Sequence, residues 1–223
     1  MRNETKPRLT EFALEMLRQK ILSGEMAPGS RISDAAVADD LRISRAPIRE
    51  ALRRLEAEHL VVDRRRRGTF VRQYKAADVV ELNEVRVVLE TAATELAIEA
   101  QASPAVLEPI LARMIEAGHN KDSLAVADAD LAFHEALVSL SGNRWLERVY
   151  RSISVQTRLV LNVYTSVVSR DLEKVAERHV PLMNAVRAGN GRGVAQMVRR
   201  HIERGLPDLV RRITSDGQDL FRP

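Results

Sequence analysis

Apolar residues recur at helical spacing three times in the first third of the chain, and they predict three short helices. The stripes consist of Leu14, Leu17 and Ile21, then Val37 and Leu41, then Ile48, Ala51, Leu52 and Leu55. Thr10, Ser33 and Ser44 precede the stripes, and each is a residue type that caps a helix N-terminus well. The pattern therefore predicts helices that begin near these three residues, and Ser23-Gly24 is expected to end the first helix.

The spacing of apolar residues changes after the third predicted helix. Leu60-Val61-Val62 and Thr69-Phe70-Val71 are short apolar runs typical of strands, and the segment from Asp63 to Gly68 between them is polar. A short helix, a tight link and a basic helix form the pattern of a helix-turn-helix. A hairpin directly after that pattern predicts a wing, so residues 1–74 are expected to form one domain.

Residues 75–223 carry no further strand signal and predict an all-α bundle. After a linker from Gln73 to Asp78, the expected helices run over residues 78–101, 122–140, 143–167, 171–188 and 191–213, and Ser103-Pro104 starts another. The first of these helices places on one face Leu82, Val85, Leu89, Ala92, Ala93 and Leu96. Trp145 is expected to pack within the bundle. The predicted fold class is therefore mainly α, with a small β-wing in the first domain.

Composition narrows the classes of function. The chain is 45% hydrophobic and 30% charged, which fits a protein that buries a core. It has no apolar run long enough to span a membrane, and its first residues lack the apolar segment of a signal peptide. Because it has no cysteine, disulfides and thiolate metal sites are excluded, and a cytoplasmic location is expected.

Positive charge is concentrated in the first domain. Residues 1–75 hold 17 Lys and Arg against 11 Asp and Glu, a balance of +6, whereas the remainder holds 18 against 20, a balance of −2. Arg45, Arg49 and Arg53 recur every fourth residue on one face of the third helix. Such a face alone is usually only solvated, but together with the helix order and the arginine-rich turn it indicates binding to duplex DNA.

Three of the five histidines lie on predicted helices of the second domain: His134, His179 and His201. Asp130 precedes His134 by four residues, so both side chains project from one helix face. A carboxylate and three imidazoles could hold one divalent cation and leave positions open for water or a ligand. Zinc is the first expectation, and nickel, manganese and iron are alternatives. The spacing alone is a weak signal, because a helical histidine is more often a surface or hydrogen-bonded residue.

Three short motifs in the first domain carry a family resemblance. They are Gly24-Glu25-Met26-Ala27-Pro28-Gly29, Ser44-Arg45-Ala46-Pro47-Ile48-Arg49-Glu50-Ala51-Leu52 and Arg66-Arg67-Gly68-Thr69-Phe70-Val71. The domain resembles the winged helix-turn-helix of GntR-type bacterial transcription regulators. The resemblance implies DNA contacts at the start of the third helix and at the wing tip, made by Ser44, Arg45, Ala46, Pro47, Arg49, Arg67 and Gly68. Two residues depart from the family pattern: Ala35 replaces an arginine of some members, and His59 replaces a glycine of many.

The candidate metal ligands also lie in segments with a family resemblance. These are Asp130-Leu131-Ala132-Phe133-His134, Glu177-Arg178-His179-Val180-Pro181-Leu182 and Arg200-His201. They resemble the FCD ligand-binding domain of the FadR subfamily, in which one class holds a metal with one aspartate and three histidines. The resemblance implies a metal site at Asp130, His134, His179 and His201. It also argues against an acyl-CoA effector, because members that bind acyl-CoA lack this set.

Other residues of the second domain are candidates for binding an effector. The resemblance implies that Arg86 points into the cavity and can fork onto a carboxylate. A salt bridge from Arg86 to Glu90, four residues further on, is the alternative. Arg158 and Asn162, one turn apart on a later helix, are further candidates to line the pocket.

Together these features predict a homodimeric regulator of transcription, the homodimer being implied by the resemblance. A small organic acid at the metal site would change binding to a pseudo-palindromic operator. A metal-dependent enzyme with a nucleic-acid-binding domain is an alternative, since a histidine site with open positions can activate water. A purely structural metal is a third possibility. We expect that the protein is not an enzyme, because no further Glu, Asp or His lies at an obvious motif spacing to serve as a general base. Repression and activation are both compatible with the sequence.

Overall fold

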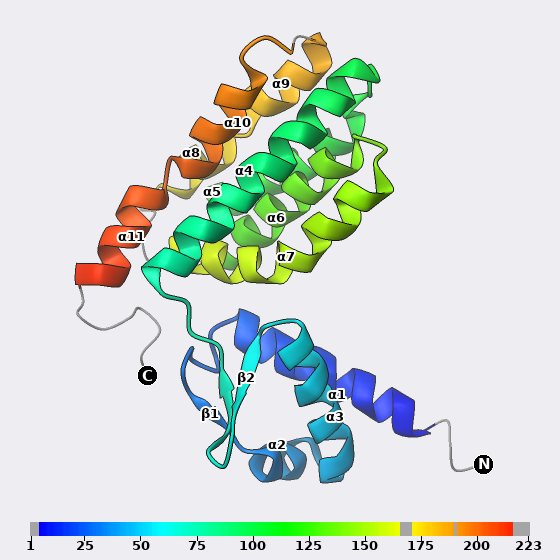
Figure 1. Ribbon diagram of the computed structural model, residues 1–223, viewed down its shortest axis with the longest axis vertical. Coiled ribbons are helices and arrows are strands. Elements are labelled where there is room, and N and C mark those ends of the chain that lie inside the picture. Colours follow the sequence, from blue (N-terminus) through cyan, green and yellow to red (C-terminus); the bar gives the residue numbers. More distant parts are fainter. Residues whose placement is uncertain (1–4, 166–170, 190, 216–223) are drawn as a thin grey trace. The chain divides into compact units, whose positions relative to one another are not determined.

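The computed structural model describes residues 5–165, 171–189 and 191–215. Its contacts divide the chain after Tyr74 into an N-terminal unit and a second unit, Lys75–Ser215. Helices dominate both units and the one sheet is small, so the predicted fold class is confirmed (Figure 1). Among the described residues, no helix is both long and apolar enough to cross a membrane.

The N-terminal unit combines three helices with a three-stranded sheet. Its elements are α1 (Thr5–Leu22), β1 (Arg31–Ile32), α2 (Asp34–Leu41), α3 (Arg45–Ala57), β2 (Val61–Arg64) and β3 (Gly68–Val71). Both α1 and α2 pack on α3, and the antiparallel strands lie in the order β1-β3-β2. Val61 pairs with Val71 and Arg64 with Gly68, so β2 and β3 form the predicted wing.

Local chemistry explains most boundaries of this unit. Ser33 Oγ accepts a hydrogen bond from the Ala36 N–H at 3.3 Å, which confirms the predicted cap of α2. His59 has a φ of +58° and therefore takes the left-handed conformation that glycine adopts at lower cost. The helix predicted from Thr10 begins earlier, at Thr5. The strand β1 was not predicted, because two residues are too few to show an alternating pattern.

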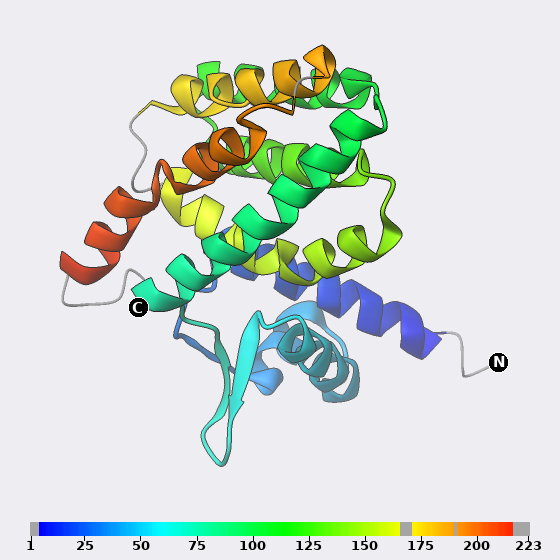
Figure 2. The same cartoon turned by 45° about the horizontal axis from the view of Figure 1, so that its top comes forward.

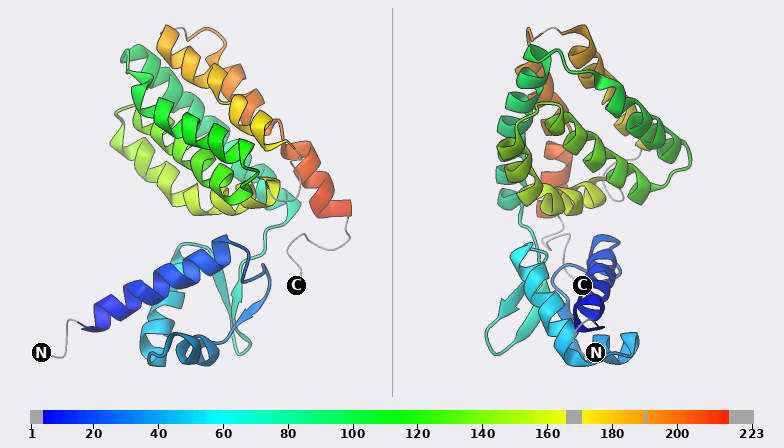
Figure 3. Two further views of the ribbon diagram at one scale, coloured as in Figure 1. Left: turned by 180° about the vertical axis from the view of Figure 1, so that it is seen from behind. Right: turned by 90° about the vertical axis from the view of Figure 1, so that its right-hand side faces the viewer.

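The second unit is a bundle of helices. Its elements are α4 (Ala76–Glu99), the 3-10 turn η1 (Pro104–Val106), α5 (Leu107–His119), α6 (Ser123–Ser139), α7 (Arg144–Val163), α8 (Leu172–Glu177), α9 (Val180–Ala188), α10 (Val194–Glu203) and α11 (Leu206–Ser215). Figure 2 shows α4 running between α7 and α10, and Figure 3 shows α6 beside α5 and α7. Helix α4 contacts α6, α7, α9, α10 and α11, and is therefore the central element.

Two of the predicted long helices are each two helices in the structure. The predicted helix over 171–188 is divided at Arg178 and His179, because Pro181 has no N–H to donate to the carbonyl of Glu177. The predicted helix over 191–213 is divided near Gly205, where a Cβ would lie 2.3 Å from the Tyr164 ring. The helix predicted over 143–167 ends at Val163, and residues 166 and 167 of that prediction lie outside the described residues.

The burial of α4 differs from the prediction. Val85, on the predicted apolar face, is 44% exposed, whereas Asn83, Arg86, Glu90 and Thr94 are at most 5% exposed. The expectation that Trp145 packs in the bundle is wrong, because its side chain is 73% exposed. A buried polar stripe requires hydrogen-bond partners. Asn83, Arg86 and Thr94 find partners within α4, whereas Glu90 also contacts Tyr150 of α7 and His134 of α6.

Candidate functional site

Three imidazoles converge in the second unit. His134 lies on α6, His179 is the residue before α9, and His201 lies in the last turn of α10. One nitrogen from each ring lies within 4.8 Å of the other two. Asp130, one turn before His134, is 5% exposed, and His134 and His179 are each 1% exposed. The structure therefore brings together all four ligand candidates of the sequence.

The Nδ1 atom of each ring faces an acceptor outside the cluster. His179 Nδ1 lies 3.0 Å from the Val175 carbonyl, and His201 Nδ1 lies 3.2 Å from the Arg178 carbonyl. His134 Nδ1 lies 2.5 Å from Glu90 Oε2. A ring that donates from Nδ1 to its acceptor leaves the Nε2 lone pair facing the centre of the cluster.

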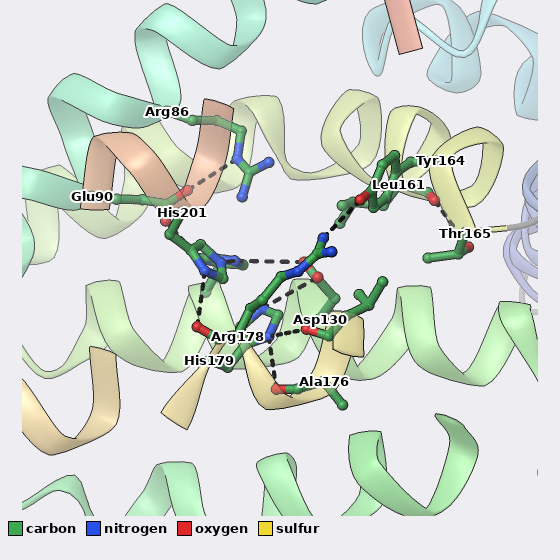
Figure 4. A network of polar contacts seen from close by, with 12 residues as sticks. Arg86, Glu90, Asp130, Leu161, Tyr164, Thr165, Ala176, Arg178, His179 and His201 are labelled. Atoms are coloured by element: carbon green, nitrogen blue, oxygen red, sulfur yellow. Dashed lines mark hydrogen bonds and ion pairs between the residues drawn. The ribbon is translucent and has the colours of Figure 1, made fainter. Parts of the chain in front are cut away.

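The helix break between α8 and α9 supplies one of these acceptors. In a continuous helix the His179 N–H would donate to the Val175 carbonyl. Here that N–H donates instead to the Ala176 carbonyl at 3.1 Å, in a tighter turn. The Val175 carbonyl is therefore left to accept from the His179 ring. The same ring nitrogen also lies 3.3 Å from the Ala176 carbonyl (Figure 4).

The centre of the cluster has the chemistry of a cation site. His134 Nε2 and His201 Nε2 are 3.2 Å apart, and Asp130 Oδ2 lies 3.3 Å from His179 Nε2. Two nitrogens bound about 2.1 Å from one ion lie about 3.0–3.4 Å apart at right-angled to tetrahedral geometry. His179 Nε2 and Asp130 Oδ1 are buried, and neither has a hydrogen-bond partner among the described residues. Lone pairs this close repel each other unless a cation lies between them, so the donor set fits a divalent metal.

The electrostatics of the cluster favour its metal-binding protonation state. Burial alone would raise the pKa of Asp130, but the nearby His179 and His134 imidazoles outweigh it and lower that pKa to about 2. Burial, together with the neighbouring imidazoles, holds the pKa of His201 well below its ordinary value. Asp130 is therefore ionised and His201 neutral near pH 7, which are the forms that bind metals.

Glu90 links this cluster to Arg86. Glu90 Oε1 accepts hydrogen bonds from Arg86 Nε and from the Tyr150 hydroxyl, each at 3.0 Å, and Oε2 faces His134. Burial would raise the pKa of Glu90, but the adjacent His134 imidazole and Arg86 guanidinium outweigh it and hold the pKa at about 2. Figure 4 shows Arg86 and Glu90 facing each other from α4. The salt bridge considered as the alternative role of Arg86 therefore forms.

Arg86 also lines a cavity beside the cluster, so its two expected roles coexist. The cavity has a volume of about 60 Å³ and is bounded by Asp130, all three histidines, Asn83, Tyr164 and Arg178. At about 10–15 Å³ of such volume for each water, it holds only a few water-sized groups. Its lining does not include Arg158 or Asn162 among the described residues. Arg158 instead pairs with Asp128, which corrects the expectation that it lines this pocket.

Glu90, Arg178 and Tyr164 were missed as parts of the site by reasoning from the sequence. Arg178 Nη1 donates to the Tyr164 hydroxyl at 2.9 Å, and both side chains reach the cavity. The signal for Glu90 was present, because it lies four residues after Arg86 and seven after Asn83 on one face of α4. No comparable spacing relates Arg178 to Tyr164, which lie on different elements.

In the N-terminal unit, most of the predicted DNA-contacting residues lie at the surface. Ser44, Arg45, Ala46, Arg49 and Arg67 are exposed, and Gly68 is half-buried. Ser44 occupies the N-cap position of α3, yet its side chain makes no capping hydrogen bond. Pro47 is buried, so its ring packs inside the unit and the structure does not present it to DNA.

Arg49 and the wing have specific local partners. Arg49 Nε donates to Asp34 Oδ2 at 2.7 Å, which links the exposed face of α3 to the first residue of α2. Gly68 has a φ of +99°, and a Cβ there would lie 3.2 Å from Arg31 Nε. The wing residue is therefore restricted both by its backbone and by its neighbour.

Comparison with known protein families matches both units. Residues 9–71 match the description "Bacterial regulatory proteins, gntR family", and residues 81–204 match "FCD domain". The chain therefore belongs to the GntR family and carries an FCD domain. It is a DNA-binding transcriptional regulator with a ligand-binding C-terminal domain.

Individual relatives agree with this assignment. The HTH-type transcriptional regulator LutR of Bacillus subtilis is 31% identical over 77% of this chain and 87% of its own length. The galactonate operon transcriptional repressor of Escherichia coli is 28% identical over 84% of this chain and 90% of its own. A solved structure of a GntR regulator from Rhodococcus sp. RHA1 covers 92% of this chain and 98% of its own, with 28% identity and a TM-score of 0.78.

Glu90→Gln tests the central ion pair. The variant keeps the shape of the side chain but leaves Arg86 buried without its anion, so we expect a loss of about 3–5 kcal/mol in the free energy of unfolding. Denaturant titration of chelator-treated protein measures it. Glu95→Gln, at an exposed position of the same helix, is the control and should change stability by less than about 0.5 kcal/mol. Equal stability of the two variants would contradict the role of Glu90.

Proposed function

We propose that a small organic acid binds beside a divalent metal held by Asp130, His134, His179 and His201, and that its binding changes affinity for a pseudo-palindromic operator. The observation that carries the proposal is the convergence of the Nε2 atoms, with His134 and His201 3.2 Å apart and every Nδ1 facing an acceptor. Zinc suits nitrogen and carboxylate ligands, and nickel, manganese and iron are the alternatives. A bound metal supplies a positive anchor for a carboxylate.

Arg86 is the second candidate anchor for such an acid. Its Nε donates a hydrogen bond to Glu90. Its Nη1 lies 3.5 Å from Asn83 Oδ1, so that second hydrogen bond is weak. The guanidinium lies at the cavity and can donate to a carboxylate from the Nη atoms. The cavity of about 60 Å³ favours a small acid over a long acyl chain. The relative named for the galactonate operon is consistent with an effector that carries a carboxylate.

The metal site also permits two other functions. A histidine centre can activate water, but Glu90, whose carboxylate lies nearer to His134 than that of Asp130, is engaged by Arg86 and Tyr150. We therefore propose a regulator that is not an enzyme, and turnover of a candidate acid at catalytic protein concentrations would contradict this. A structural metal is distinguished by chelation, which would then lower the melting temperature and leave the effector response intact.

The proposed DNA surface consists of Ser44, Arg45, Ala46 and Arg49 on α3 and of Arg67 and Gly68 on the wing. The first turn of α3 offers exposed N–H groups and an uncommitted Ser44 hydroxyl, both suited to phosphate. Arginine side chains can read guanine in the major groove. Pro47 is left out of the proposed surface because it is buried.

Arg49→Ala is expected to weaken operator binding by about 1–3 kcal/mol and to reduce discrimination between operator and random DNA. Fluorescence anisotropy with both duplexes measures this. Arg54→Ala is the control, because it removes the same charge from α3 but from a side chain that pairs with Glu11 of α1. If Arg49→Ala binds like the wild type, α3 is not the reading helix.

We further propose that the active form is a homodimer that acts as a repressor. Val85 and Val88 on α4 are 44% and 66% exposed, and Trp145 and Val149 on α7 are 73% and 48% exposed. Each pair shares one helix face, and α4 packs against α7. Apolar surface of this kind is suited to a partner copy.

Val88→Arg is expected to raise the dimer dissociation constant by at least about tenfold, because it buries an unpaired charge in the proposed interface. Analytical ultracentrifugation over a range of concentrations measures it. Val106→Arg adds the same charge at an exposed valine outside α4 and α7. An unchanged constant for Val88→Arg would place the interface elsewhere.

The switch itself is tested by operator binding of metal-loaded protein across a panel of small carboxylates. At least one acid is expected to change operator affinity about 5–150-fold, a coupling of about 1–3 kcal/mol. His179→Ala should lower the metal content, measured by elemental analysis, and abolish that response. His119→Ala is the control. It removes an exposed histidine of α5 and should leave both the metal content and the response of operator binding unchanged. If no acid changes operator affinity, or if His179→Ala keeps full metal content, the proposed site is wrong.

A further inference from the structure

A second and larger cavity adjoins the metal site. It has a volume of about 490 Å³, within the range of about 300–1,000 Å³ typical of sites for organic ligands. His201 and Arg178 line both cavities. His134 and His179 are almost fully buried, whereas His201 is only partly buried. His201 and Arg178 therefore form a wall that has the candidate metal centre on one side and this cavity on the other.

The lining of the second cavity is cationic and apolar. Besides His201, it consists of three apolar side chains, Pro181, Leu182 and Met197, and three arginines, Arg178, Arg200 and Arg204. It includes no acidic side chain among the described residues. A ligand for this cavity would therefore combine an anionic group with an apolar body.

Two of these arginines lack anionic partners. Arg200 and Arg204 are exposed, lie one turn apart at the end of α10, and make no side-chain hydrogen bond or ion pair within the described part of the chain. Arg199 on the same helix is different, because its Nη1 donates to Glu203 Oε1 at 2.9 Å. The guanidinium groups that remain unpaired are therefore those on the cavity side.

We propose that this cavity is a separate binding site for an organic anion, in which Arg200 and Arg204 hold a phosphate or carboxylate. Two guanidinium groups one turn apart can each donate two hydrogen bonds to the same oxoanion. Pro181, Leu182 and Met197 cover the apolar body of the ligand. Such a ligand would contact His201 and Arg178 directly, and its site differs from the metal-dependent effector site because its anchors are arginines.

Titration calorimetry with phenyl phosphate tests the proposal. The full-length protein should bind phenyl phosphate but not phenol, which lacks the anion. The double variant Arg200→Gln and Arg204→Gln should weaken binding at least about tenfold, since it removes both charge-assisted anchors. Arg199→Gln is the matched control, because it removes one charge from the same helix outside the cavity, and should stay within about twofold of the wild type. Metal content should be the same in all these proteins.

Metal removal separates this site from the proposed effector site. Chelator-treated wild-type protein should still bind phenyl phosphate, because no metal ligand is one of its anchors. If binding disappears on chelation but survives the double variant, the probe occupies the metal site and the proposal is wrong. Equal affinities for wild type, double variant and control would also overturn it. Neither result bears on whether carboxylates change operator binding through the metal.

Discussion

The second unit depends on one buried carboxylate shared by three helices. Glu90 of α4 accepts hydrogen bonds from Arg86 of α4 and Tyr150 of α7, and it faces Nδ1 of His134 on α6. An isolated carboxylate at this depth would be protonated or would destabilise the fold. Its polar neighbours keep the pKa of Glu90 at about 2, so the ion pair that links these helices also orients the ring of His134, a proposed metal ligand.

The sequence was sufficient for the class of each unit and for four candidate metal ligands that the structure brings together, because these depend on residue types in recognisable segments. The sequence was insufficient to predict which face of α4 is buried. Hydrophobic periodicity favoured Leu82, Val85 and Leu89, yet the buried stripe is polar, from Asn83 to Thr94. Its central residue, Glu90, is contacted by Tyr150 of α7 and His134 of α6, and tertiary contacts of this kind leave no mark in a local pattern.

Helix breaks were similarly hard to foresee. Gly205 lies opposite the Tyr164 ring, a neighbour about forty residues away in sequence, so the division between α10 and α11 depends on packing. In the N-terminal unit, Asp34 of α2 holds Arg49 of α3 by an ion pair. A tethered arginine loses less conformational freedom on binding DNA than a free one. The ion pair with Asp34 therefore restricts the orientation of Arg49 on the proposed DNA surface.

The proline-induced break before α9 lowers the continuity of the helix but helps to orient the His179 ring. Pro181 prevents one continuous helix, and the resulting tight turn frees the Val175 carbonyl to fix the His179 ring. A residue that restored the missing N–H would lengthen the helix and return that carbonyl to the backbone ladder. The His179 ring would then lose the contact that selects its tautomer. At this position a more continuous helix and a well-oriented His179 ring therefore make competing demands on one backbone carbonyl.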